Sequence, residues 1–310
     1  MYIEQGYRGN LGRWKYFFIP AGFVGLMVVN YLTVINSTIS VEEAYQQMID
    51  AIGKNTFFAM NLAFLAFGLL LVLAWTKWVH PQSIRSLTTS RKRIDWKRVL
   101  FAFLIWGGIT VGVTLLDVAL SPDDYQWNFR WEAFWKLAVI AILLIPLQTS
   151  FEEYLFRGHM LQGLGIIARN RWVPLVVTSL LFGLLHIANP EVEKLGYGAL
   201  VYYIGTGFFL GIITLMDEGL ELALGFHAAN NLITALLVTA DWTAFQTDSL
   251  YLDISDPSLG WEAYVPVFVV FPLLLWIFAR KYGWKNWRSR LTGPVLSEAE
   301  ARAEFEKNDR

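Results

Sequence analysis

The sequence predicts an all-α, polytopic membrane helix bundle with about eight transmembrane helices. Its 310 residues are 55% hydrophobic and only 16% charged, whereas soluble domains carry about a quarter charged residues. The apolar residues gather in blocks close to the roughly 20 residues that a helix needs to cross a bilayer. Tryptophans stand at many block ends, as they do in interfacial aromatic belts. A large soluble core is the alternative, but such cores rarely need so many uninterrupted apolar runs.

Eight candidate spans follow one another along the chain. They cover Tyr16–Ile35, Phe57–Trp75, Val99–Leu120, Phe134–Ser150, Trp172–Ala188, Ala199–Met216, Leu222–Ala240 and Tyr264–Ala279. The first run is too long for a signal-peptide core, and no small-residue cleavage site follows it, so we expect it to be retained. Polar groups interrupt the ends of the fourth and fifth runs, so the boundaries of these two spans are the hardest to predict.

The spans divide into three regions. Residues 1–133 hold the first three spans and a basic loop, residues 134–240 hold spans four to seven, and residues 241–310 hold an acidic loop, the last span and a tail. The tail opens with Ser297-Glu298-Ala299-Glu300, a capping-box pattern. We therefore expect a short, solvated helix between Ser297 and Arg310.

The distribution of basic residues predicts the orientation. If the N-terminus is cytoplasmic, the cytoplasmic ends and loops hold eighteen Lys or Arg, including Arg13, Arg157 and the seven in 77–98. The opposite loops hold three, and the loop 241–263 is acidic with no basic residue. This positive-inside bias places both termini in the cytoplasm. The loop-poor chain without cysteine suggests a prokaryotic plasma membrane.

Composition also excludes several classes of function. A net charge of −1 gives no electrostatic basis for binding nucleic acid. The absence of cysteine rules out a disulfide framework, thiol catalysis and thiolate metal sites. The apolar blocks make the lipid bilayer an expected partner.

Two adjacent carboxylates follow the fourth span. Charged groups at membrane depth are costly and often functional. In a continuing helix, Glu153 and Arg157 stand at i and i+4 and can pair, whereas Glu152 projects about 100° away. One carboxylate is then structural, and the other is free to act as a proton acceptor. An interfacial charge cluster that closes a helix is an equally good interpretation of this motif alone.

Two histidines lie inside apolar segments. His186 follows Phe182 by one helical turn, and alone it more often indicates a hydrogen-bonded core residue than a catalyst. His227 and Asn231 stand at i and i+4 and project from one helical face. Both can donate hydrogen bonds to a developing oxyanion, although a polar clasp between helices fits them as well.

Taken together, a carboxylate, two histidines and an asparagine could converge between helices. Such a set can hold a water molecule, remove its proton and stabilise a tetrahedral oxyanion, which is the chemistry of amide hydrolysis. The expected boundaries place His186 deeper in its span than Glu152. We therefore expect that the fifth helix begins earlier, near Gly165, or that the fourth helix runs further than Ser150.

The ordered motifs Glu152-Glu153-x-x-x-Arg157, Phe182-x-x-x-His186 and His227-x-x-x-Asn231 resemble those of the CAAX protease and bacteriocin-processing family. This family, also called Abi, includes the Ras-converting CAAX endopeptidases. The resemblance covers about 134–240. It implies an all-α intramembrane endopeptidase that depends on glutamate and acts on a membrane-associated protein or peptide. We expect it to need no cofactor.

The resemblance also implies a role for each matched residue. Glu152 would be the general base, and His186 would help to hold and polarise the water. His227 and Asn231 would form the oxyanion hole. The remaining residues would support the site: Glu153 and Arg157 would orient it, and Phe182 would shape the pocket.

Two other interpretations remain open. Glu152, His186 and His227 could supply a His₂Glu zinc site, although the sequence lacks the His-Glu-x-x-His pattern of common zinc peptidases. The protein could instead be a non-catalytic scaffold or immunity protein, since function has to be argued from the site. The substrate and its prenylation are not specified by the sequence.

Overall fold

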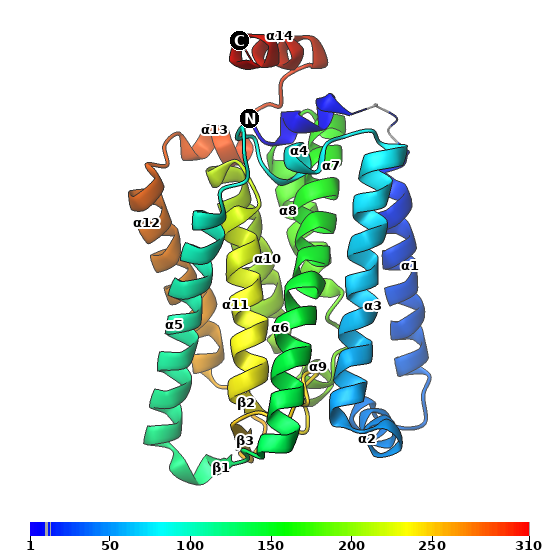
Figure 1. Cartoon of the computed structure of the whole chain (residues 1–310), viewed down its shortest axis with the longest axis vertical. Coiled ribbons are helices and arrows are strands. Elements are labelled where there is room, and N and C mark those ends of the chain that lie inside the picture. Colours follow the sequence, from blue (N-terminus) through cyan, green and yellow to red (C-terminus); the bar gives the residue numbers. More distant parts are fainter. Residues whose placement is uncertain (10–11, 13, 310) are drawn as a thin grey trace.

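The computed structural model describes residues 1–9, 12 and 14–309 and forms a helical bundle (Figure 1). Arg13, one of the basic residues used to predict orientation, and Arg310, the end of the expected tail helix, lie outside the described residues. The first half comprises η1 (Ile3–Arg8), α1 (Lys15–Ile35), α2 (Val41–Ile52), α3 (Lys54–Ala74), η2 (Trp75–Val79), α4 (Ile84–Thr88), α5 (Trp96–Leu120), η3 (Pro122–Asp124), β1 (Tyr125–Trp127), α6 (Trp131–Glu153) and η4 (Tyr154–Met160).

The second half continues the bundle and ends in a short helix beyond it. Its elements are α7 (Leu161–Ala168), α8 (Trp172–Leu184), α9 (Pro190–Leu195), η5 (Tyr197–Ala199), α10 (Leu200–Asp217), α11 (Glu221–Leu237), β2 (Val238–Thr239), β3 (Tyr251–Asp253), η6 (Trp261–Tyr264), η7 (Pro266–Val270), α12 (Phe271–Tyr282), α13 (Trp287–Thr292) and α14 (Glu298–Asp309). The chain is therefore all-α apart from three short strands, in the order β1–β3–β2.

Six helical segments in the described part are long and apolar enough to cross a membrane. They are Lys15–Ile35, Lys54–Val79, Trp96–Leu120, Trp131–Ala168, Tyr197–Asp217 and Trp261–Tyr282. The other two expected spans are helices as well, but α8 has 13 residues and α11 has 17. The polytopic all-α fold is thus confirmed, and the count of eight spans stays a prediction.

The fourth span is longer than the sequence indicated, and its expected end at Ser150 is wrong. A single 38-residue helix runs from Trp131 to Ala168 through α6, η4 and α7. The η4 segment is a π-helix, a local widening that often marks functional sites. The charged side chains after Ser150 do not end the helix, because Glu153 and Arg157 have buried ion-pair and hydrogen-bond partners. Arg157 consequently lies inside a helix, not in a cytoplasmic segment.

The two ends of the bundle differ in what they contain. Both termini, α4, α13 and α14 lie at one end, whereas α2, α9 and the strands lie at the other (Figure 1). The basic loop 77–98 and the acidic loop 241–263 therefore lie at opposite ends. Inside the bundle, α11 packs against α5 and α6, and α10 packs against α8. Because α8 also contacts η4 and α10 contacts α11, the three motif-bearing segments come together.

Candidate active site

The paired glutamates lie in the middle of the long helix. Glu152 is 16 residues before Ala168, or about 24 Å at 1.5 Å per residue, and His186 is 14 residues, or about 21 Å, from the start of α8 at Trp172. The two residues thus have similar depths. The mismatch in the sequence-based boundaries is resolved by the fourth helix running further than expected, not by an early start of the fifth.

Glu153 and Arg157 form a fully buried ion pair. Arg157 Nη1 donates to Glu153 Oε1 at 3.0 Å, and neither side chain is accessible. Arg157 Nη2 donates to the carbonyl of Gly207 on α10 at 3.2 Å. The guanidinium also lies 4.1 Å from the centre of the Phe182 ring, within cation–π range. The pair predicted at i and i+4 therefore ties α6 to α8 and α10.

His227 lies between the two glutamates. Its Nδ1 is 2.8 Å from Glu153 Oε1, and its Nε2 is 3.6 Å from Glu152 Oε2. A carboxylate only accepts hydrogen bonds, so the Nδ1–H of His227 donates to Glu153. This contact fixes the ring and turns Nε2 toward Glu152. The side chain of Glu152 is 12% exposed, whereas that of Glu153 is 0% exposed.

Asn231 reaches Glu152 through a glutamine. Asn231 Nδ2 donates to Gln148 Oε1 at 3.0 Å, and Gln148 Nε2 donates to Glu152 Oε1 at 2.6 Å. An amide nitrogen carries two hydrogens, so Asn231 keeps a second N–H beyond its bond to Gln148. The two oxygens of Glu152 thus differ, because Oε1 is held by Gln148 and Oε2 faces His227.

His186 lies in the turn after α8, next to the same aromatic ring. Its Nδ1 is 2.8 Å from the carbonyl of Phe182, which can only accept, so Nδ1 carries the hydrogen and Nε2 is left as an acceptor. The Phe182 ring centre is 5.1 Å from that of His186 and 5.9 Å from that of His227. The Tyr203 ring stacks on His186 at 4.1 Å. Phe182 therefore separates and aligns the two histidines.

The expected residues thus come together, with one difference in detail. Glu152, Glu153, Arg157, His227 and Asn231 form a continuous set of polar contacts. His186 joins this set through its hydrogen bond to the Phe182 carbonyl and through packing on the rings of Phe182 and Tyr203. The His186 ring is held between Phe182 and Tyr203. Its bond to the Phe182 carbonyl uses Nδ1, so Nε2 is left for another partner.

The arrangement of the donor side chains bears on the zinc alternative. In the described part of the chain, no group of three or more His, Asp or Glu side chains is arranged to hold a metal ion. The set Glu152, His186 and His227 does not fit a tetrahedral zinc site in this structure, and no step of the chemistry below passes through a metal.

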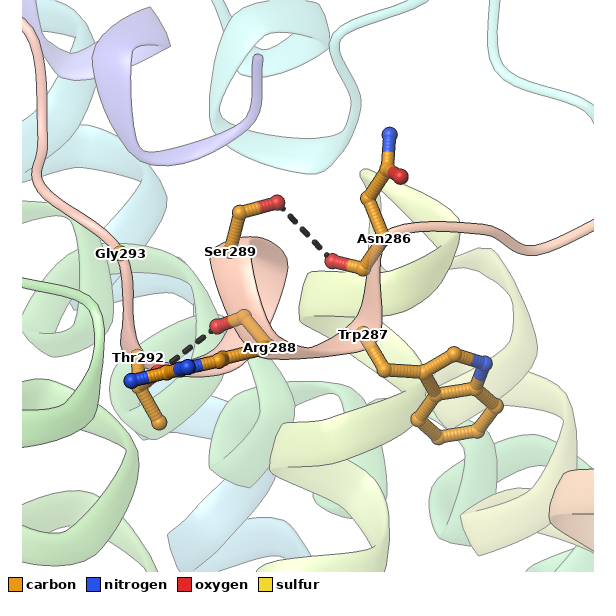
Figure 2. A pocket seen from close by; sticks show the side chains of 6 residues that line it. All are labelled: Asn286, Trp287, Arg288, Ser289, Thr292 and Gly293. Atoms are coloured by element: carbon orange, nitrogen blue, oxygen red, sulfur yellow. Dashed lines mark hydrogen bonds between the residues drawn. The ribbon is translucent and has the colours of Figure 1, made fainter.

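A separate pocket lies at the end of the bundle that holds the termini. Asn286, Trp287, Arg288, Ser289, Thr292 and Gly293 line it, all from α13 and its flanks (Figure 2). The Ser289 hydroxyl donates to the Asn286 carbonyl, and Thr292 donates to that of Arg288. These bonds belong to the turn itself. The pocket contains none of the motif residues, so we place the candidate active site at Glu152 and His227.

Sequence reasoning missed several residues of this site. Gln148 stands one turn before Glu152, and Asn230 accepts hydrogen bonds from Trp106 and Tyr202. Gln148 could have been found, because it is a polar residue at i−4 from the glutamate in an apolar run. Trp106 and Tyr202 could not, because an aromatic residue in a span more often indicates packing or an interfacial position.

Comparison with known proteins supports the resemblance. Residues 131–233 match the family model described as "Type II CAAX prenyl endopeptidase Rce1-like". The chain is 29% identical over 268 residues to the uncharacterized protein YyaK of Bacillus subtilis, which covers 84% of this chain and 90% of that protein. No solved structure matches. The match spans the long helix, α8, α10 and most of α11, so all three motifs lie within it. Residues 131–233 of this multi-pass membrane protein are therefore similar to the Rce1-like type II CAAX prenyl endopeptidases.

Proposed function

We propose that this protein is an intramembrane, glutamate-dependent endopeptidase that hydrolyses a peptide bond of a membrane-associated or lipidated protein. The observation that supports this best is the division between adjacent carboxylates. Glu153 is sealed between Arg157 and His227 at 0% exposure, whereas Glu152 retains 12% exposure and an oxygen 3.6 Å from His227 Nε2. A base must reach a water molecule, and only Glu152 can do so.

The proposed first step uses the space beside Glu152. A water molecule there can donate hydrogen bonds to Glu152 Oε2 and to the free Nε2 of His186. Both neighbours accept, so the lone pairs of the water oxygen point toward a substrate carbonyl. Glu152 takes the proton as the oxygen attacks the carbonyl carbon, and it returns that proton to the leaving amine when the C–N bond breaks. Atoms and charge balance without a covalent enzyme intermediate.

The oxyanion that forms needs donors fixed in advance. The second N–H of Asn231 and the Nε2–H of His227 in its protonated form are the two candidates. Glu153 holds the His227 ring from the other side through Nδ1, and Arg157 holds Glu153. Residues Glu153, Arg157 and Phe182 therefore orient the site without touching the reacting atoms.

We propose a prenylated, C-terminal CAAX-type peptide as the substrate class, because the matched family model is described by that activity. The orientation that we propose places both termini and the basic loop 77–98 in the cytoplasm, following the positive-inside bias. A bacterial relative supports a prokaryotic plasma membrane. Residues 134–240 would form the catalytic unit, with the flanking spans enclosing it.

The experiment that tests the function uses the purified full chain in lipid nanodiscs. The probe is a fluorophore-and-quencher peptide that ends in a farnesylated Cys-aliphatic-aliphatic-Ser sequence. We expect wild type to cleave it and Glu152→Gln to lose activity at least about a hundredfold, since the base is absent. Full activity of Glu152→Gln contradicts glutamate dependence, and a folded wild type that never cleaves the probe contradicts the substrate class.

Chelation separates the metal-free chemistry from the zinc alternative. Prolonged treatment with EDTA or 1,10-phenanthroline should leave the cleavage rate unchanged, because every residue used above acts without a metal. If activity falls on chelation and returns with added zinc, the protein is a metalloprotease, and the roles assigned to Glu152 and His227 must be redrawn.

A further inference from the structure

A chain of side-chain hydrogen bonds crosses three helices and ends on Glu152. It begins at Trp106 on α5, passes through Asn230 and Asn231 on α11, and reaches Gln148 and Glu152 on α6. The successive donor–acceptor distances are 3.1, 3.1, 3.0 and 2.6 Å. The three intermediate side chains are uncharged amides. Each can donate through its nitrogen and accept through its oxygen, so the direction of the chain depends on how each amide is turned.

The direction of this chain is fixed at its far end. An indole N–H can only donate, so Asn230 must turn its Oδ1 toward Trp106. The Asn230 nitrogen then donates to Asn231 Oδ1, which forces the Asn231 nitrogen toward Gln148 Oε1. Gln148 is left with only its nitrogen to present to Glu152. The assignment of each amide oxygen and nitrogen thus follows from the one donor whose role cannot reverse.

The opposite direction has a different consequence for Glu152. If all three amides were reversed, Gln148 would present Oε1 to Glu152 Oε1, and two acceptors would meet unless the glutamate carried a proton there. In the observed direction, a donor faces the carboxylate at 2.6 Å, and such a bond is stronger to an ionised acceptor than to a neutral one. The observed direction therefore gives Glu152 a hydrogen-bond donor, whereas the reverse direction would give it an acceptor.

We propose that Trp106 is a positioning residue that sets the direction of this chain and so holds Glu152 as a proton acceptor. The inference rests on the proposed function, because it concerns the same base. Tyr202 reinforces the arrangement, since its hydroxyl also donates to Asn230 Oδ1 at 3.2 Å. Trp106 is 6% exposed and packs on Phe226 at 4.5 Å between ring centres, so its N–H is held in place.

The variant that tests this is Trp106→Phe, which keeps an aromatic ring against Phe226 and removes the N–H. Its matched control is Trp276→Phe on α12, where the indole is 56% exposed and faces away from the core. The probe is dicyclohexylcarbodiimide, which modifies protonated carboxyl groups in apolar surroundings. Labelling of the full-length protein at neutral pH is measured by mass spectrometry, with Glu153 as the internal reference.

We expect Glu152 labelling to rise about tenfold in Trp106→Phe relative to wild type and Trp276→Phe, as expected for losing about one net hydrogen bond. Glu153 labelling should not change. Gln148→Met, which removes the last donor, should give a similar rise, and the double variant should add little to it, since the residues act as one unit. Unchanged Glu152 labelling in Trp106→Phe, or additive effects in the double variant, overturns the proposal.

Two further measurements keep the test decisive. If Trp106→Phe fails to fold, Asn230→Ala breaks the chain at its second link, and wild-type labelling in that variant overturns the proposal. With the farnesylated reporter, Trp106→Phe should lower kcat about tenfold and leave KM unchanged, because a displaced base affects only the transition state. Activity retained in Glu152→Gln would refute the proposed function, whereas an unchanged kcat in Trp106→Phe alone refutes only the role of Trp106.

Discussion

At the scale of single residues, the site distinguishes two neighbouring glutamates by what surrounds them. Glu153 binds a buried arginine and a histidine, whereas the side chain of Glu152 stays 12% exposed. The sequence predicted the Glu153–Arg157 pair, because i and i+4 spacing is a local property of a helix. It could not predict that His227, 74 residues away, contacts both carboxylates, since that depends on how α11 packs.

This difference predicts opposite outcomes for two similar substitutions. Glu153→Gln leaves the Arg157 guanidinium buried without a counterion, and breaking a buried pair in this way costs about 3–5 kcal/mol. We expect a lower unfolding temperature and a lower yield. Glu152→Gln should unfold close to the wild-type temperature, because its side chain is partly accessible and pairs with no buried cation. Thermal unfolding in detergent, followed by tryptophan fluorescence, compares them; equal losses in both variants contradict the division of roles.

At the scale of elements, the helix boundaries were the hardest feature to predict. The charged run Glu152–Arg157 looks like the end of a span, because charges at membrane depth are costly. The helix continues to Ala168 because partners on α8, α10 and α11 compensate those charges. These partners lie 50 and 74 residues away along the chain, so the sequence around the charged run could not indicate them. The three short strands were also not expected, since runs of two or three residues have no recognisable period.

The close approach of α11 to α5 gives a prediction at this scale. A Cβ on Gly225 would lie 2.0 Å from the carbonyl oxygen of Val99, which is backbone and cannot rotate away. Gly225→Ala should therefore push α11 from α5, destabilise the protein by about 1–3 kcal/mol and reduce cleavage by displacing His227, two residues further on.

The matched control for this prediction is Gly108→Ala on α5, where a Cβ would meet no described atom within 4 Å. Alanine favours a helix over glycine by about 1 kcal/mol, so this variant should be at least as stable as wild type. Unfolding temperature and reporter cleavage are measured for both variants. Equal behaviour of the two would show that the α5–α11 contact does not position the site.

At the scale of the whole molecule, the sequence predicted the membrane class, the all-α bundle and the residues that meet in its interior. Composition and the length of the apolar blocks are sufficient to predict the membrane class, and the order of the motifs predicted the resemblance that the family model matches over residues 131–233. The arrangement of the ends also agrees with the distribution of charge, because the basic loop 77–98 and both termini lie together (Figure 1).

The natural absence of cysteine allows the proposed orientation to be tested directly. Ser289→Cys and Ser258→Cys each place one thiol on an exposed position, at opposite ends of the bundle. In intact cells, a membrane-impermeant maleimide should label Ser258→Cys, and it should label Ser289→Cys only after permeabilisation. The reverse pattern places the termini outside the cytoplasm and contradicts the positive-inside assignment.

The most direct test of glutamate-dependent proteolysis compares the termini of membrane proteins in host cells. One strain expresses wild type and the other Glu152→Gln, at matched levels of protein. Proteolysis by this site predicts new termini that appear only with wild type, and they identify the substrate and the cleaved bond together. Identical terminal profiles in the two strains contradict it and favour a protein that acts by binding.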